Sequence, residues 1–599
     1  MNANGSKKPA EAIPNRPPAQ SVAAQSDRRW KAILAIGGLV LMTLAVYWPL
    51  HKAGYFWDDA QWVTNNPLVH HWRGFEIFWL HPKSMDQYYP LTFSFLSVEY
   101  HLWGLQTLPY HLVNVLFQAT NAILLWLVLR RLELRSAWLV AALFAIHPVQ
   151  VETVAWVAEI KNLLSGFFYF LALLTFLRFL DIGGGSVGAS ESKSPPKPHA
   201  NHQLYILSTL LFLLGLLSKT AVCTLPVAIL VIFWWKGRLH DKEALLRLIP
   251  WFIIAFIIGL VTIHVEHTST GAHGADWRFS MAQRFLIAGH AFWFYLLKLL
   301  WPHPLLMVYP RWALGSSLGF LWLIAAVALF AALWLLRSRI GRGPLAAMLF
   351  YLVTIGPVLG FISFYTQLFS FVADHYQYLA CIGPMALAGE LLYWAADHTA
   401  KWRPIVPTVT AAIILSVLGW ITLSHCRLYD SDYALWHYVY RHNRQSFIVK
   451  ALYGATLIER PGEAGQGLVQ LAAANAMHPH IEPIVFNLAG ACMLTGHYHR
   501  ALHYYGWYLL HNPASVDAWT DSANCLAALR AYEPAAKDLE MACQLKPDFA
   551  LGWMELAHVS YLAGHHRQAE QSFQRAIRLN PALAKFKGIV LSISAPAAR

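Results

Sequence analysis

The stretch Gly54-Tyr-Phe-Trp-Asp-Asp-Ala-Gln-Trp-Val-Thr-Asn-Asn66 follows directly after the first long apolar segment of the chain. Two adjacent carboxylates, Asp58 and Asp59, stand in it among the aromatic residues Tyr55, Phe56, Trp57 and Trp62. An acidic pair just past a membrane exit is a poor anchor for a lipid surface, but it suits a base that meets a lipid-linked substrate. Neighbouring helical side chains point about 100° apart, so only one of the two can face a reacting atom. The other would cap the next helix or orient a partner, and the alternative is that both do no more than this.

The composition is that of a membrane protein. Of the 599 residues, 57% are hydrophobic and 13% are charged, whereas soluble proteins carry roughly 25% charged residues. The formal net charge is +13, but the sequence contains no recognisable nucleic-acid-binding module. We therefore expect the positive charge to reflect the orientation of the chain in the membrane. The six cysteines and 29 histidines form no CxxC or HExxH spacing, which predicts neither a disulfide framework nor a metal site.

Apolar segments long enough to cross a bilayer recur through residue 424. The candidates are 32–50, 109–130, 137–154, 163–180, 204–217, 221–235, 248–265, 316–336, 344–363, 378–396 and 404–424. They predict an all-α membrane domain over 31–427 with about eleven spans. A tail over 1–30 is predicted to be disordered, and 181–203 is a Gly- and Pro-containing linker. We expect 282–300 to be a re-entrant or interface-lying helix.

The distribution of basic residues predicts the orientation of these spans. One set of loops holds Arg130, Arg131, Arg135, Lys193, Lys197, Lys236, Arg238, Lys242, Arg247, Arg337, Arg339, Arg342, Lys401 and Arg403. With the N-terminus inside, all of these loops are cytoplasmic by the positive-inside rule. Asp58, Asp59 and everything after residue 424 then face the periplasm or the lumen.

A repeat follows the membrane domain. Pro479, Pro513, Pro547 and Pro581 are spaced 34 residues apart, and the same interval separates Ala501, Ala535 and Ala569 and also Trp519 and Trp553. This period and order are those of tetratricopeptide repeats, in which each unit is a helix pair. The predicted units are 448–481, 482–515, 516–549 and 550–583, which form an α-solenoid. A connector over 428–447 precedes them and a tail over 584–599 follows.

Further ionisable residues lie at membrane depth on the predicted outer side: His147, Glu152, Lys161, Lys219 and His375. Such groups are costly in a membrane and are usually functional. A cation among them could hold a phosphate leaving group. The alternative for Lys161 or Lys219 is snorkelling to the lipid headgroups. Convergence of these residues on one face favours the functional interpretation.

The order of several motifs resembles the GT-C superfamily, and in particular the family of transmembrane and tetratricopeptide-repeat O-mannosyltransferases and its bacterial relatives. The matching stretches are Phe56-Trp-Asp-Asp59 with Asn65-Asn66, Tyr89-Pro-Leu-Thr92, Tyr110-His111 with Asn114, His147-Pro-Val-Gln-Val-Glu152, Leu217-Ser-Lys219 and Tyr378-Leu379. Three positions depart from the family pattern: Tyr89 and His375 stand where the family often has arginine, and Thr220 stands where it usually has glutamate. These three positions would affect which donor sugar is used.

The resemblance implies an inverting hexosyltransferase that takes a sugar, mannose-like by analogy, from a polyprenyl-phosphate donor. Asp58 or Asp59 would deprotonate an acceptor hydroxyl of a protein or glycan. Lys161, Lys219, His147 or His375 would meet the phosphate, with Glu152 and Tyr89 as further substrate-binding candidates. No cofactor is expected, and a divalent metal ion stays open as an alternative. The repeats would recruit the acceptor or dock a partner protein, and no nucleic acid is expected.

Two other function classes fit parts of the sequence. An O-antigen polymerase or ligase usually carries a large outer loop late in the chain, but here 364–377 is short and the acidic loop comes first. A membrane scaffold that only presents repeats needs neither so many spans nor ionisable residues on one side. No Asn-x-Ser/Thr sequon lies in the segments assigned to the outside, which favours a bacterial inner membrane with periplasmic repeats over the endoplasmic reticulum.

Overall fold

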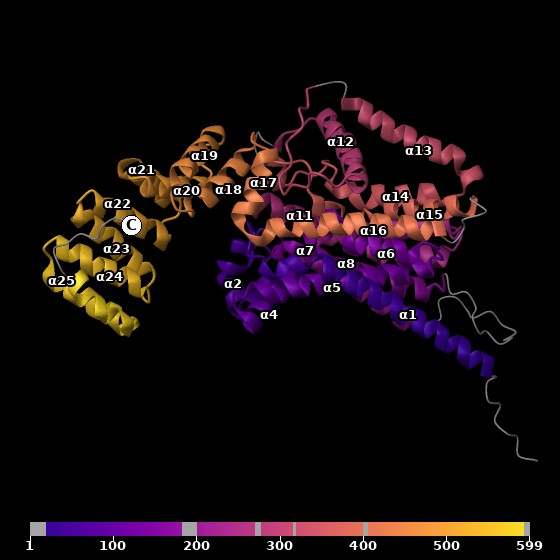
Figure 1. Ribbon diagram of the computed structural model, residues 1–599, viewed down its shortest axis with the longest axis horizontal. Helices are drawn as coiled ribbons and strands as arrows, with labels where there is room; N and C mark the ends of the chain where they lie inside the picture. Colours follow the sequence, from indigo (N-terminus) through magenta and orange to yellow (C-terminus); the bar gives the residue numbers. More distant parts are fainter. Residues whose placement is uncertain (1–18, 183–200, 270–276, 316–318, 399–404, 592–599) are drawn as a thin grey trace, which may run out of the picture. The chain divides into compact units, whose positions relative to one another are not determined.

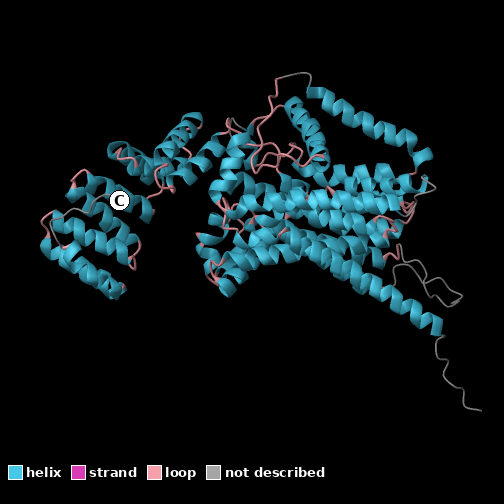
Figure 2. Ribbon diagram, in the orientation of Figure 1, coloured by secondary structure: helices cyan, strands magenta, loops and turns pink. Residues whose placement is uncertain are grey.

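The computed structural model describes residues 19–182, 201–269, 277–315, 319–398 and 405–591, and these residues form helices and loops without a strand (Figure 2). The predicted all-α fold is confirmed for this part of the chain. Residues 1–18 of the predicted tail, most of the linker with Lys193 and Lys197, the basic residues Lys401 and Arg403, and the last eight residues lie outside it. The predicted tail is too long, because helix α1 (Ala19–Val46) begins inside it. Its first residues, rich in Ala and Gln, favour continuing the apolar helix backwards.

The membrane unit comprises residues 1–305, 314–365 and 374–427. Its main helices are α4 (Pro90–Trp103), α5 (Thr107–Arg131), α6 (Ala137–Ile146), α8 (Ile160–Phe179), α9 (His202–Ser218), α10 (Leu225–Trp235), α11 (Lys242–Ser269), α12 (Met281–Leu300), α13 (Phe320–Ile340), α14 (Gly343–Ile355), α15 (Ile382–His398) and α16 (Ile405–Cys426). Helices α5 and α8 pack along one another (Figure 1). Buried apolar side chains of α5, α6 and α8 form a large part of the core of this unit.

The number of continuous spans is smaller than the sequence predicts. By length and composition, six helices of the described chain can cross a membrane: those over Arg29–Val46, Thr107–Arg131, Val157–Phe179, Lys242–Glu266, Phe320–Ile340 and Thr408–Asp430. A seventh is the broken pair Ala137–Ile146 and Pro148–Ala155, bent by 53°. The prediction of about eleven counted every apolar run. These runs include α9, α10 and α14, which are shorter apolar helices in the structure, and the run over 137–154, which is interrupted at Pro148.

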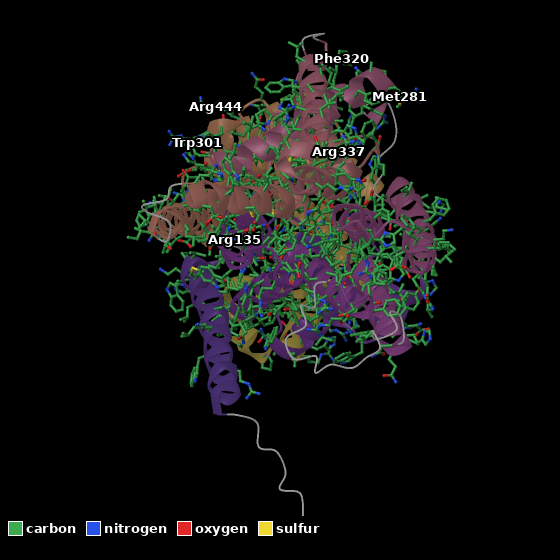
Figure 3. All side chains as sticks on the ribbon, turned by 90° about the vertical axis from the view of Figure 1, so that its right-hand side faces the viewer. Arg135, Met281, Trp301, Phe320, Arg337 and Arg444 are labelled. Carbon is green, nitrogen blue, oxygen red and sulfur yellow. The ribbon has the colours of Figure 1, made fainter. Side chains whose placement is uncertain are left out.

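The loops rich in arginine and lysine meet at one end of the membrane unit. They are joined by an ion pair and two hydrogen bonds, from Arg135 to Asp397, from Lys236 to the Leu132 carbonyl and from Arg342 to the Trp234 carbonyl. Figure 3 labels Arg135 and Arg337, two of the arginines on which the predicted orientation depends. The contacts show that these loops share a side, as the basic-residue distribution predicts.

Helix α12 is absent from the set of candidate spans and runs across the direction of α5 and α16 (Figure 1). Arg284 near its start donates to the carbonyls of Gly360 and Phe361, in the loop that follows α14. At its other end, the Leu299 carbonyl bonds to His147, which follows α6. The expectation of a re-entrant or interface-lying helix over 282–300 stays a prediction.

The repeat unit contains α17 (Asp432–His442) and four helix pairs: α18 (Phe447–Ile458) with α19 (Ala464–Met477), α20 (Glu482–Leu494) with α21 (Tyr498–His511), α22 (Val516–Ala528) with α23 (Tyr532–Leu545), and α24 (Ala550–Leu562) with α25 (His566–Leu579). The tryptophan and proline of the sequence repeat make the same contact each time. The Trp519 indole donates to the Pro513 carbonyl at 2.9 Å, and Trp553 donates to Pro547 at 3.1 Å. The predicted helical repeats are confirmed.

Two loops, 306–313 and 366–373, belong to the repeat unit although they fall within the range predicted for the membrane domain. The Asn443 amide donates to the Val308 carbonyl at 3.1 Å, and Arg311 donates to the Leu368 carbonyl at 3.0 Å. Because the second loop lies between Tyr365 and Asp374, the chain leaves the membrane unit and returns to it directly before His375.

Candidate functional site

Asp59 connects the acidic loop, residues 54–66, to the turn Val157–Glu159 directly before α8. Its carboxylate accepts the backbone N–H of Phe56 at 2.8 Å and that of Ala158 at 2.7 Å, and the side chain is fully buried. Burial raises the pKa of Asp59, while the two N–H groups oppose that rise. The side chain does not cap the helical turn that follows it, Ala60–Thr64, as the sequence allowed. Both oxygens of the Asp59 carboxylate therefore already accept a hydrogen bond, as in a residue that holds a loop in place.

Asp58 differs from Asp59 in its exposure and in its hydrogen bonds. Its side chain is partly exposed, and no group of the described residues makes a hydrogen bond or ion pair with its carboxylate. Burial raises the pKa of Asp58 to about 6, with the charge of Lys161 acting in the opposite direction. A carboxylate with both oxygens available and a pKa close to neutrality is suited to accept a proton. Asp58 is therefore the stronger of the two predicted bases.

Glu159, which the sequence analysis did not single out, is the centre of the site. Its buried carboxylate lies 2.7 Å from the Lys161 ammonium, 3.6 Å from that of Lys219 and 3.8 Å from Nε2 of His375. The Asn162 amide donates to it as well. Because three cationic or basic side chains converge on one carboxylate, they must lie within a few ångströms of each other.

Glu152 orients His375. One oxygen of the Glu152 carboxylate bonds to Nδ1 of His375 at 3.0 Å, and the other accepts the backbone N–H of the same residue at 3.1 Å. The bond at Nδ1 directs Nε2 toward Glu159. The structure thus unites two predicted site residues that lie 223 positions apart in the chain.

Two further predicted residues have different outcomes. The Tyr89 side chain bonds to Thr220, the residue after Lys219. His147 makes its hydrogen bonds elsewhere. One ring nitrogen of His147 accepts the N–H of Val149, which follows in the same turn, and the other bonds to the Leu299 carbonyl. Both ring nitrogens of His147 therefore already have a hydrogen-bond partner outside the cluster.

Aromatic rings surround the carboxylates. Trp57 stacks on Trp156 with the ring centroids 5.8 Å apart and the planes inclined by 13°, and the Trp156 indole donates to the Phe56 carbonyl. Trp57 has a φ of 46°, which is uncommon for a bulky residue and is held only where the surroundings enforce it. The stack and the Asp59 bonds together fix the backbone immediately before Asp58.

Sequence reasoning missed Glu159, Asn162 and Glu266. Glu159 stands two positions before Lys161 at the start of an apolar run, which is the signal that could have identified it. Glu266 lies at the end of α11 and is close enough to Lys219 and Lys161 for their charges to act on it. Within the described ranges, no group of three or more His, Cys, Asp or Glu side chains is placed to hold a metal ion.

Several curated proteins that are similar to this chain are named protein O-mannosyl-transferases. Protein O-mannosyl-transferase TMTC3 of Mus musculus is 31% identical over 150 residues, 23% of this chain and 16% of that protein. The Homo sapiens TMTC3 is 30% identical over 158 residues, 25% of this chain and 17% of that protein. This chain resembles the TMTC family of protein O-mannosyl-transferases. The Caenorhabditis elegans relative F38B6.6 is 26% identical over 212 residues, 33% of this chain and 28% of its own length.

The chain spans about a sixth of the length of the two TMTC3 proteins it matches. No protein-family model matches it. Among solved structures, MamA MSR-1 C2 covers 25% of this chain and 87% of its own, with a TM-score of 0.24 and 18% identity. The crystal structure of MamA protein covers 26% of this chain and 84% of its own, with a TM-score of 0.23 and 14% identity.

Proposed function

We propose that this chain is an integral-membrane glycosyltransferase that moves a mannose-like hexose from a polyprenyl-phosphate donor to a hydroxyl group of a protein or glycan. The observation that carries the proposal is the half-buried side chain of Asp58. Its carboxylate makes no hydrogen bond or ion pair with the described residues, and it lies near a cluster that contains two lysines. A base and a set of cations within one site are the two groups that this transfer needs. The names of the TMTC relatives support the sugar and the protein acceptor.

In the proposed reaction, the Asp58 carboxylate accepts the proton of the acceptor hydroxyl. The hydroxyl oxygen forms a bond to the anomeric carbon on the face opposite the phosphate, and the bond from that carbon to the phosphate oxygen breaks. The phosphate oxygen keeps the electron pair and leaves with the polyprenyl chain. The sugar is therefore inverted, as in glycosidases with a base on the opposite face. No cofactor or metal ion takes part in the proposal.

We infer the compartment in which the reaction takes place from the end of the membrane unit that carries the basic loops. The arginine-rich loops gather at one end, and by the positive-inside rule this end is cytoplasmic. The acidic loop follows the first span, so Asp58 faces the opposite compartment, which we propose to be the periplasm of a bacterium or, as the alternative, the lumen of the endoplasmic reticulum. The tetratricopeptide array, after the last span, would recruit the acceptor there.

A transfer assay tests the proposal. Purified full-length protein in detergent is given a radiolabelled polyprenyl-phosphate mannose and an extract of envelope proteins, with other polyprenyl-phosphate hexoses in parallel. Transfer is expected with the wild type and is expected to fall at least a hundredfold in Asp58→Asn, because general bases contribute about 10²–10⁴-fold. Glu99→Gln is the matched control, since Glu99 is a buried carboxylate on α4 outside the cluster. Equal transfer by wild type and Asp58→Asn would remove Asp58 from the mechanism. A reaction abolished by chelation and restored by a divalent cation would contradict the metal-free form of the proposal.

A further inference from the structure

Lys161 is held on several sides at once. Its ammonium lies 2.7 Å from Glu159 and 4.3 Å from the centre of the Trp62 ring, with the Trp156 ring 5.7 Å away. Its side chain is 7% exposed. An ammonium that is bonded to a carboxylate and covered by an indole face has little donor capacity left for a ligand.

Lys219 is less constrained than Lys161. Its ammonium lies 3.6 Å from Glu159, which is longer than the roughly 2.7–2.9 Å of a charge-assisted hydrogen bond. The side chain is 13% exposed, the largest value among the basic groups around Glu159. Lys219 also occupies the break between α9 and the following turn, Thr220–Thr224, where its backbone is extended. Its three N–H donors can reach a ligand without the loss of a short bond.

We propose that the two lysines have separate tasks: Lys161, packed on the Trp62 ring shortly after Asp58 in the chain, supplies positive charge that favours the ionised form of Asp58, and Lys219 binds the phosphate that leaves the sugar. This inference rests on the proposed transfer from a polyprenyl phosphate. When the bond from the anomeric carbon to the phosphate oxygen breaks, that oxygen keeps the electron pair, and the Lys219 ammonium donates an N–H to the resulting anion. Lys161 touches no reacting atom and acts through Asp58.

The electrostatic surroundings of Asp58 support this division. The groups whose charges act on Asp58, or that respond to its charge, are Lys161, Glu159, Asp86, His375, Asp59 and Tyr365. Among these, Lys161 stabilises the ionised form most strongly, ahead of His375. Lys219 is not one of the principal charges on Asp58. Loss of Lys161 should therefore make Asp58 harder to ionise, whereas loss of Lys219 should leave its ionisation nearly unchanged.

The test compares kcat/KM as a function of pH, and KM for the donor, in Lys161→Met and Lys219→Met. In Lys161→Met the acid limb of the pH profile is expected to move up by about one pH unit, since an opposite charge nearby shifts a carboxyl by about 1–3 units. In Lys219→Met the acid limb is expected to stay in place while KM for the donor rises roughly ten- to a hundredfold, as expected for a lost hydrogen bond to a charged group. Lys219→Arg should recover most of the donor affinity.

Two additions keep the test decisive. Binding of unlabelled polyprenyl phosphate to the full chain needs no turnover, and it should weaken in Lys219→Met but not in Lys161→Met. If Lys161→Met does not fold, Trp62→Leu removes the ring against the ammonium and should move the same acid limb. Lys236→Met is the matched control, because Lys236 bonds to the Leu132 carbonyl in the cluster of arginine-rich loops.

The outcomes separate this inference from the function on which it rests. If the wild type transfers sugar and Asp58→Asn does not, but both lysine variants change the same parameter to the same degree, the division of tasks is wrong and the function stands. Equal binding of polyprenyl phosphate by wild type and Lys219→Met would also overturn the division. If Asp58→Asn transfers like the wild type, the proposed function itself fails.

Discussion

Replacing Asp59 with Asn should destabilise the protein, and replacing Asp58 with Asn should not. The Asp59 carboxylate accepts two buried backbone N–H groups, at 2.8 Å from Phe56 and 2.7 Å from Ala158. An asparagine offers one carbonyl oxygen, so one of these N–H groups would face an amide N–H₂ and lose its acceptor. A buried donor left unsatisfied costs about 1–3 kcal/mol. At Asp58 no hydrogen bond within the described chain is lost, so the change should be within about 0.5 kcal/mol.

The assay is thermal unfolding of each full-length variant in the same detergent, with transfer activity measured at two temperatures. Asp59→Asn should unfold at a lower temperature and should regain part of its activity when assayed in the cold, because its defect is in the position of the loop. Asp58→Asn should unfold like the wild type and remain inactive at both temperatures. The reasoning would be refuted by an Asp59→Asn protein as stable as the wild type, or by an Asp58→Asn protein that is the less stable of the two.

Three further predictions concern pH, packing and the repeats. Burial raises the pKa of Asp58 to about 6, so kcat/KM should fall about tenfold per pH unit below pH 6 as the base is protonated, and a rate that stays level down to pH 4.5 would contradict this. Gly166→Ala should lower the unfolding temperature, because a Cβ there would lie 2.7 Å from the Tyr378 ring and overpacking costs about 1–3 kcal/mol; Gly37→Ala, with nothing within 4 Å, is its control, and an equal effect of both would refute the packing argument. Tyr505→Phe should destabilise the repeat unit by about 1–2 kcal/mol, because the Tyr505 hydroxyl donates to Asp521 at 2.9 Å; this is measurable by circular dichroism of the full chain, and an unchanged melting curve would show that the bond is unimportant.

The repeats were predictable because their signal is local. Trp519 and Trp553 each bond to the carbonyl of a proline six residues earlier, so the same local contact recurs at two successive boundaries between repeats. The spans were less predictable, because an apolar run gives the length of a helical segment but does not show where the helix bends. Nothing in the hydropathy of 137–154 shows that the helix bends at Pro148. Loops 306–313 and 366–373 join the repeat unit through carbonyl contacts, and carbonyls have no sequence signal.

Several members of the candidate site could be predicted from the sequence, but Glu159 at its centre and the contacts of each residue could not. Ionisable residues at membrane depth identified Glu152, Lys161, Lys219 and His375, and the structure brings them together. The difference between Asp58 and Asp59 depends on the N–H of Ala158, 99 positions away, which a single sequence cannot supply. The contacts of His147 could not be predicted for the same reason: its partner is the carbonyl of Leu299, 152 positions away.

The central claim is that Asp58 removes the acceptor proton in a single displacement at the anomeric carbon. The most direct test is the configuration of the product linkage, determined by NMR after transfer from a polyprenyl-phosphate mannose of defined anomeric configuration. One displacement with a base opposite the phosphate predicts a product of inverted configuration, absent when the reaction is run with Asp58→Asn. A product that retains the donor's configuration would require a covalent sugar intermediate and would contradict the role assigned to Asp58.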